Sequence, residues 1–142
     1  MNTRNVAIVV FYDKNFTIAV QERGSHSRVG EKYGFLGGQI EVGETPSEAI
    51  ARELKEEIGY IPKKLEYFLH YSYVVLEDCR FAGWTIHCDV FLSPITKKLE
   101  QAHITEGTGI VKMPLGQAIE GEGFPKNSTA FLKKLKAKIE KK

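Results

Sequence analysis

Cysteine is scarce in this 142-residue chain, which contains only Cys79 and Cys88. Two cysteines cannot build the disulfide framework of a small secreted domain, and unpaired thiols are typical of a reducing compartment. No apolar run approaches the roughly 18 residues of a membrane-spanning helix. The first residues, MNTRNVAIVV, lack the basic region and cleavage site of a signal peptide. We therefore expect a cytoplasmic protein without a membrane segment.

A strong net charge is also missing, since 20 Lys and Arg face 18 Asp and Glu, while 42% of the residues are hydrophobic. This composition excludes intrinsic disorder. The length suits one domain, which can bury a core without disulfides or a structural metal. We expect a single domain over residues 1–142.

The charge is unevenly distributed, because residues 126–142 contain seven Lys and one Glu. One interpretation is a solvated helix face, and another is a contact for a polyanion such as RNA. An apolar stripe predicts that this helix docks on the core. The stripe consists of Phe131, Leu132, Leu135 and Ile139.

The hydrophobic pattern predicts a mixed α+β fold without internal repeats. Strands are expected over Asn5–Tyr12, Phe16–Gln21, Tyr33–Leu36, Leu65–Glu77, Trp84–Leu92 and Gly109–Met113. Helices are expected over Pro114–Ile119 and Ser128–Lys141, and a loop over residues 24–32. The strand Tyr33–Leu36 is expected to stop at Gly37-Gly38, because glycine allows a sharp bend.

The best-signalled helix lies between Thr45 and Ile58. Thr45 and Glu48 have the spacing of a capping box, and Pro46 occupies the favoured first helical position. Gly59 provides a left-handed residue that ends the helix.

Three carboxylates, Glu53, Glu56 and Glu57, share one arc of this helix because residues three and four apart lie on one face. The core stripe lies beside them and consists of Ile50, Leu54 and Ile58. Clustered carboxylates repel one another, so they indicate either a solvated acidic face or a site for a hard cation such as Mg²⁺.

The spacing resembles the Nudix box, which here spans residues 38–60. Eight of its nine defined positions match, and the departure is Tyr60, where an aliphatic residue is usual. The matching positions are Gly38, Glu44, Arg52, Glu53, Leu54, Glu56, Glu57 and Gly59. A motif of this length with fixed spacing is highly specific.

The resemblance implies a Nudix hydrolase and the Nudix fold, a mixed β-sheet sandwiched between α-helices. Such enzymes cleave a nucleoside diphosphate linked to another group, using Mg²⁺ or Mn²⁺ and water. By this resemblance Glu56, Glu57 and the Gly37 carbonyl would be metal ligands. Glu53 would be a ligand or the base that activates water, and Arg52 would orient it.

Weaker similarities extend to the MutT type of nucleoside triphosphate pyrophosphatase. Arg23 would touch a phosphate there, or be an exposed charge at a strand end. Glu106 would add a ligand or assist the water, or be an ordinary loop acid. Asn127 resembles an Asn that reads a purine edge, but capping of the last helix by Ser128 or Asn127 is the favoured interpretation.

Phe35 precedes the glycine pair, and Gly38 begins the box, so both are expected to border the substrate. Phe35, Tyr73 and Trp84 are candidates for stacking on a base, although aromatic residues of this kind more often belong to the core. The expected activity is Mg²⁺-dependent pyrophosphohydrolysis of nucleoside triphosphates, including oxidised purine nucleotides. Alternative substrates are dinucleoside polyphosphates, nucleotide sugars, ADP-ribose or RNA 5′ ends. A nucleotide-sensing module is the non-enzyme alternative, and either a monomer or a homodimer is compatible.

Overall fold

The computed structural model describes residues 2–23, 31–76, 79–102, 109–125 and 127–141. Its strands are β1 (Thr3–Tyr12), β2 (Thr17–Glu22), β3 (Tyr33–Gly34), β4 (Leu36–Gln39), β5 (Glu66–Val74), β6 (Thr85–Pro94) and β7 (Gly109–Pro114). Its helices are α1 (Pro46–Ile58), α2 (Lys97–Glu100), α3 (Leu115–Ile119) and α4 (Ser128–Glu140).

The strands of the described residues form one mixed sheet around β1. The main path runs β3-β2-β1-β6-β5, with β4 paired to β1 and β7 paired to β2. β1 and β6 are parallel, whereas the other pairs are antiparallel. β1 therefore lies centrally and has neighbours along its whole length.

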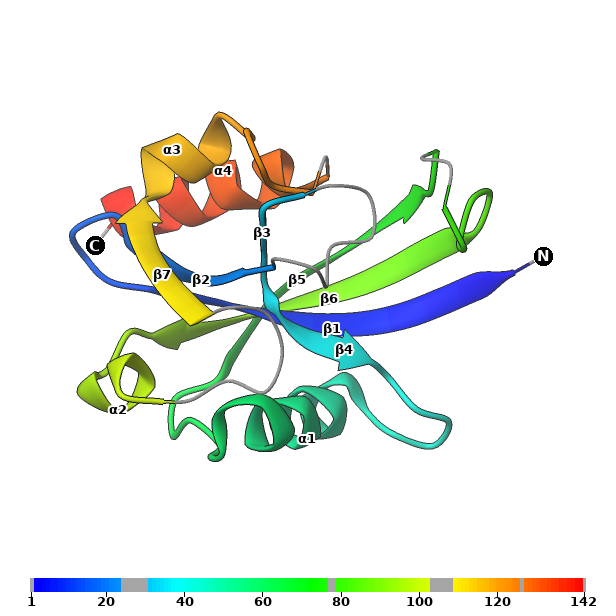
Figure 1. Ribbon diagram of the computed structural model, residues 1–142, viewed down its shortest axis with the longest axis horizontal. Helices are drawn as coiled ribbons and strands as arrows, with labels where there is room; N and C mark the ends of the chain where they lie inside the picture. The colour runs from blue at the N-terminus through cyan, green and yellow to red at the C-terminus, as the bar shows by residue number, and fades with distance from the viewer. Residues whose placement is uncertain (1, 24–30, 77–78, 103–108, 126, 142) are drawn as a thin grey trace.

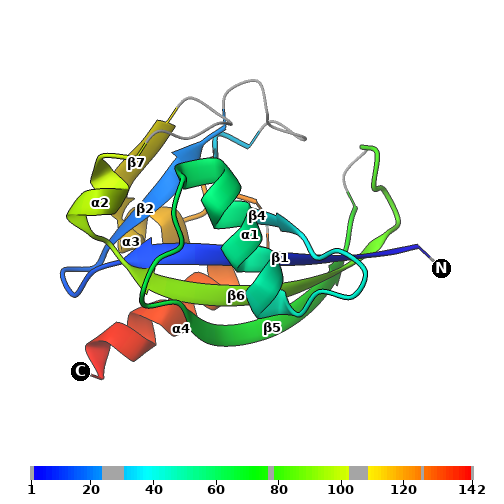
Figure 2. The same cartoon turned by 90° about the horizontal axis from the view of Figure 1, so that it is seen from below.

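Helices cover both faces of this sheet, as Figures 1 and 2 show: α1 lies on one face, and α3 and α4 lie on the other. The alternation of side chains along β1 supplies both cores. Ala7, Val9 and Phe11 belong to the core under α1, and Val10 belongs to the core under α4. The predicted α+β sandwich is confirmed.

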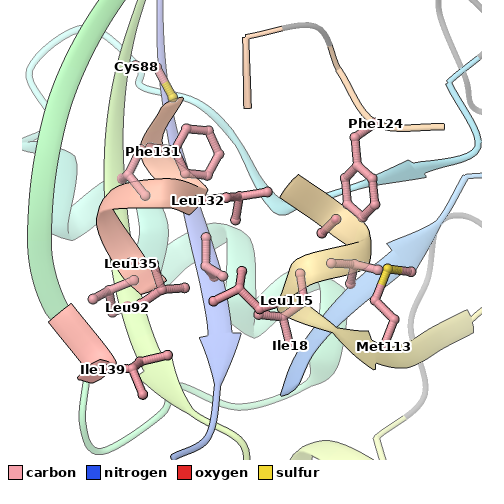
Figure 3. Packing of buried hydrophobic residues seen from close by; sticks show 14 residues of the cluster. Ile18, Cys88, Leu92, Met113, Leu115, Phe124, Phe131, Leu132, Leu135 and Ile139 are labelled. Atoms are coloured by element: carbon pink, nitrogen blue, oxygen red, sulfur yellow. The ribbon is translucent and has the colours of Figure 1, made fainter. Parts of the chain in front are cut away.

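The apolar stripe of α4 docks on the sheet as predicted. Its four members, Phe131, Leu132, Leu135 and Ile139, are all buried. Figure 3 shows them with Leu92 and Cys88 of β6 and with Ile18 of β2. The basic helix is therefore an integral part of the core, and its remaining face carries the lysines.

One expectation about local structure is wrong, and one short helix was not expected. The strand before α1 does not stop at Gly37-Gly38, because β4 runs through both glycines, which pair with Ile8 and Ala7 of β1. The short helix α2 was not predicted; a side-chain cap, in which Thr96 Oγ1 accepts from the Leu99 N–H at 3.2 Å, starts it. None of the helices in the described ranges is both long and apolar enough to cross a membrane.

Candidate active site

The position of α1 is fixed by caps at both of its ends. Thr45 Oγ1 accepts from the Glu48 N–H at 3.1 Å, and Glu48 Oε1 accepts from the Thr45 N–H at 2.9 Å. Gly59 ends the helix with a positive φ of 85° and donates to the Lys55 carbonyl. This capping box, predicted from the sequence, fixes the residue at which the helix begins.

The three carboxylates of α1 differ in burial. Ile50, Leu54 and Ile58 are buried against the sheet, as predicted. Glu57 is also buried at 4% exposure, whereas the side chains of Glu53 and Glu56 are 19% and 62% exposed. The predicted acidic arc therefore runs from the interior to the solvent, with Glu53 between the two extremes.

Gly37 and Gly38 let β4 approach these carboxylates closely. The Gly37 N–H donates to Glu57 Oε1 at 3.1 Å. A Cβ on Gly37, whose φ is 147°, would lie 2.0 Å from the Ala7 carbonyl oxygen of β1. A Cβ on Gly38 would lie 2.5 Å from Glu53 Oε1. Gly37 thus excludes a side chain because of the backbone of β1, whereas a side chain at Gly38 would displace the Glu53 carboxylate.

Arg52 joins the loop, the strand and the helix. Its Nε and Nη2 donate to the two carboxylate oxygens of Glu44 at 2.7 and 2.9 Å, and Nη2 also donates to the Gln39 carbonyl. Its Nη1 donates to Glu53 Oε1 at 2.9 Å and lies 3.9 Å from Glu56 Oε1. Arg52 therefore contacts Glu53, the residue that the resemblance assigns to it, and is itself bound by Glu44.

This network changes the acidity of its members. Hydrogen bonds from Arg52 and from the Glu41 N–H lower the pKa of Glu44 to about 2. Hydrogen bonds to Glu44 and Glu53 raise the pKa of Arg52 above its ordinary value. Glu44 and Arg52 thus both stay charged at neutral pH, which keeps the guanidinium in place.

Glu53, Glu56 and Glu57 are suitable ligands for a hard divalent cation, because their side chains offer only oxygen atoms. Within the described ranges, no three His, Cys, Asp or Glu side chains converge into a preformed metal cage. Mg²⁺ commonly takes only one or two carboxylates, together with substrate phosphates and water. A cation that arrives with its nucleotide is therefore compatible with this arrangement.

A cavity of about 490 Å³, the glycine hollow, opens on the α4 face of the sheet beside β4. The predicted substrate residues Arg23, Phe35, Gly38 and Asn127 all line it, as does Gly37. Its size is typical of pockets for small ligands. Gly37 and Gly38 are thus shared, since they line the hollow and also contact the carboxylates of α1.

The floor of the glycine hollow is apolar and uncharged. Phe35 packs against Phe124 and Phe131, with ring centroids 5.8 and 5.3 Å apart. Burial is the main cause that raises the pKa of Tyr71 above its ordinary value and that of Cys88 to about 12. Both groups are neutral at physiological pH, so the floor suits a planar, uncharged ring.

Several expected residues have other positions. Capping by Asn127 is wrong: this exposed residue precedes α4, but its side chain makes no cap hydrogen bond. Ser128 Oγ instead donates to the Pro125 carbonyl at 2.7 Å. Trp84 does not line the glycine hollow, although Tyr73 does. Glu106 lies outside the described residues.

Sequence reasoning missed Arg4 and Phe131, which also line the hollow. The signal for Arg4 was available, because Arg4, Val6 and Ile8 alternate along β1 and so share one face. The sequence pattern assigned Phe131 to the core. Its side chain is buried in the core and also lines the hollow. What the pattern did not indicate is that α4 leaves this end of the sheet face open.

Comparison with known proteins shows the family of the chain. The NUDIX domain profile matches residues 1–131, and the chain therefore belongs to the Nudix family. It is 34% identical over 73 residues to the 8-oxo-dGTP diphosphatase of Escherichia coli strain K12, an alignment that covers 51% of this chain and 57% of that protein. It is 40% identical over 55 residues to the 8-oxo-dGTP diphosphatase of Proteus vulgaris, covering 39% and 49%.

The chain thus spans about half the length of the curated relatives it matches. Its fold is similar to that of the MutT protein from Methanosarcina mazei Go1, with a TM-score of 0.76 and 15% sequence identity. That superposition covers 96% of this chain and 95% of the other.

Proposed function

We propose that this chain is a Mg²⁺- or Mn²⁺-dependent pyrophosphohydrolase of nucleoside triphosphates, with oxidised purine deoxynucleotides as favoured substrates. One observation carries the proposal: Gly37 and Gly38 line the glycine hollow and also contact Glu57 and Glu53. A nucleotide in the hollow would therefore present its phosphates to the carboxylates across two residues without side chains. The names of the E. coli and P. vulgaris relatives support an oxidised guanine nucleotide as the substrate.

The reaction joins water to a nucleoside triphosphate and gives a nucleoside monophosphate and pyrophosphate. The water oxygen forms a bond to phosphorus, one P–O–P bridge breaks, and the water proton passes to a base. Glu53 is the base that we propose, because Arg52 fixes its orientation beside Gly38. Such a base contributes about 10²–10⁴-fold to the rate.

Glu56, Glu57 and the Gly37 carbonyl would hold the divalent cation, and Glu53 could share it. When bound, the cation supplies positive charge that offsets the charge of the phosphate oxygens. Glu57 suits this role because its Oε1 is held by the Gly37 N–H, so its carboxylate is already oriented. Glu56 is exposed and therefore open to a cation arriving with substrate.

The other end of the glycine hollow would select the base. Phe35 offers a ring face, and the exposed Asn127 amide offers one acceptor and two donors to a purine edge. Because Asn127 makes no cap hydrogen bond, this role does not compete with helix formation. Arg23 would contact a phosphate from the same hollow.

The test is a product-resolved hydrolysis screen with Mg²⁺, in which the wild type is compared with Glu57→Gln. The panel contains the four dNTPs, 8-oxo-dGTP, ADP-ribose, a nucleotide sugar and triphosphorylated RNA. We expect monophosphate and pyrophosphate from one triphosphate, and no measurable turnover by Glu57→Gln. The variant should fold, because a Gln carbonyl still accepts from the Gly37 N–H.

Glu140→Gln is the matched control, since it removes one exposed carboxylate from α4. Wild-type turnover by Glu57→Gln would refute the ligand assignment. Tight nucleotide binding without turnover by the wild type would refute the enzyme and favour the sensing module instead.

A further inference from the structure

A cluster of polar side chains lies on one face of β5 and β6, and we call it the strand-pair cluster. Its members are Tyr67, His70, Ser72, His87 and Asp89. None of these five described residues lines the glycine hollow. α1 lies over β1 and β4, and β5 runs along the edge of the sheet beside it (Figure 2). The cluster is therefore separate from the site of the proposed function.

The pairing of the two strands brings the cluster together. His70 pairs with Asp89, and Ser72 pairs with His87. Residues two apart in a strand share a face, so these four form two adjoining cross-strand pairs. A register shift immediately after Tyr67 lets its side chain reach Asp89 as well. Irregularities of this kind commonly turn a side chain to the other face of a strand.

Asp89 fixes the position of one proton in the cluster. Its Oδ1 accepts from the Tyr67 hydroxyl at 2.8 Å and lies 2.9 Å from His70 Nδ1. A carboxylate only accepts hydrogen bonds, so His70 Nδ1 carries the proton and donates it. In the neutral ring Nε2 then keeps a lone pair, and it lies 3.4 Å from Ser72 Oγ. Hydroxyl, imidazole and carboxylate therefore follow one another in a line.

Exposure increases along this line from the acid to the hydroxyl. The side chains of Asp89 and His70 are 14% and 46% exposed, and Ser72 is exposed. Partial burial and the neighbouring Asp89 carboxylate raise the pKa of Tyr67 to about 12, so its hydroxyl keeps the proton that it donates. The carboxylate is thus held by two donors, while the hydroxyl of Ser72 is open to a substrate.

His87 holds Ser72 from the other side. Its Nδ1 lies 2.7 Å from Ser72 Oγ, and its ring stacks on that of His70 with centroids 5.9 Å apart and planes at 18°. A serine hydroxyl has one proton and two lone pairs. Ser72 can therefore give its proton to His70 while its oxygen accepts from His87 Nδ1–H.

The surroundings of Ser72 suit a small uncharged substrate. Val74 lies two residues further along the same face of β5, is 50% exposed, and offers an apolar contact to a short acyl chain. Among the strands that the structure describes, β5 has a neighbour on one side only. An edge strand directs alternate backbone N–H groups away from the sheet. Such groups can donate to an oxygen that becomes negative during a reaction.

We propose that Ser72 is a nucleophile that takes the acyl group of small carboxylic esters, with His70 as its base and Asp89 as the positioning residue for His70. Ser72 Oγ bonds to the acyl carbon and its proton passes to His70 Nε2. The bond from the acyl carbon to the alcohol oxygen breaks, and the alcohol leaves with that proton. Water then attacks the acyl carbon with the same base, which releases the acid and restores Ser72. A nucleophile, its base and a group that orients the base are the elements of such sites on unrelated folds.

The experiment measures hydrolysis of 4-nitrophenyl acetate and labelling by a fluorophosphonate, both on the full chain in EDTA. The fluorophosphonate forms an oxygen–phosphorus bond and releases fluoride, so mass spectrometry of peptides locates the reactive hydroxyl. We expect the label on Ser72, and ester hydrolysis that Ser72→Ala lowers by about 10-fold or more. Hydrolysis at the wild-type rate by Ser72→Ala, or a chain without label on Ser72, would overturn the proposal.

Substitutions in the same line test the assigned roles. His70→Gln removes the base, so the labelling of Ser72 should slow by about 10²-fold or more. Asp89→Asn should cause a similar loss, because an amide that donates to Nδ1 favours the wrong tautomer of His70. Ser47→Ala, at an exposed position on α1, is the matched control and should keep both rates.

A thermal melt of each variant separates loss of the nucleophile from loss of the fold. His70 and Ser72 are exposed, so their variants should melt close to the wild type. Labelling that survives His70→Gln in a folded chain, or that is lost from His87→Gln alone, would refute His70 as the base.

The second activity goes beyond the proposed function and does not depend on it. EDTA removes the cation that the proposed pyrophosphohydrolysis needs, and it should leave the labelling of Ser72 unchanged. Absent pyrophosphohydrolysis with Mg²⁺ would therefore refute only the proposed function, whereas labelling that requires Mg²⁺ would overturn the role of Ser72.

Discussion

Replacing Gly38 with Ala isolates the contact between β4 and the proposed base. The added Cβ would lie 2.5 Å from Glu53 Cδ and Oε1, and ordinary contact begins at 3.4 Å. The Glu53 carboxylate must therefore retreat by about 1 Å. A misplacement of this size at a reacting group can reduce the rate about 10²-fold. We expect kcat of Gly38→Ala to fall by about that factor.

The fold should survive this substitution, because the clash involves the end of a flexible side chain. Thermal unfolding should therefore change little, whereas Gly37→Ala should unfold, since its Cβ meets the backbone of β1. Gly116→Ala is the matched control: its Cβ meets no atom within 4 Å, and it should keep wild-type kcat.

Steady-state kinetics on the preferred triphosphate measure the change in kcat, and a thermal melt measures the change in stability. Shortening the acid by one methylene should relieve the clash, so Glu53→Asp should cost less in the Gly38→Ala background than in the wild type. The reasoning would be refuted by a folded Gly38→Ala enzyme with wild-type kcat. It would also be refuted if the two substitutions were simply additive.

Three further outcomes are expected. Glu44 has a pKa of about 2 when folded and an ordinary value near 4.5 when unfolded, so its ion pair stabilises the protein above pH 4.5 and loses this effect as pH falls toward 2. The free energies of unfolding of wild type and Glu44→Gln, measured in urea, should therefore converge between pH 4.5 and 2, and a constant difference would contradict this. Asn127→Ala should raise KM about 10-fold for the preferred base without changing thermal stability, and uniform KM changes across bases would exclude edge recognition. Leu132→Ala, at a fully buried position, should destabilise by about 2–5 kcal/mol in the same urea assay, and a loss below 1 kcal/mol would show that α4 is not docked.

The sequence predicted α1 and its carboxylates accurately because the signals are local. Thr45, Pro46 and Gly59 define the helix ends within a few residues, and the burial of Ile50 follows from helical periodicity. The contact from Arg52 to Glu53 is also local, because the two residues are neighbours on the helix.

The error at Gly37-Gly38 has a different cause. Glycine permits a bend, but it also permits close approach, and the sequence alone does not distinguish these two uses. The deciding atom is the Ala7 carbonyl oxygen, which belongs to a strand about 30 residues earlier. The pairing of β1 with β4 is a non-local contact, so the continuation of the strand through both glycines could not be foreseen.

The glycine hollow depends on how α4 lies across the sheet, which the sequence of a single segment does not determine. Alternation along β1 places Val6 and Ile8 on the α4 face, where side chains of this kind are normally covered. They line a hollow because α4 leaves that end of the sheet open. The carboxylates lie on the opposite face with α1, and Gly37 and Gly38 of β4 border both environments. We therefore expect selectivity and chemistry to change independently: substitutions around Asn127 should alter which base is accepted, while Glu53 and Glu57 keep their contacts with β4.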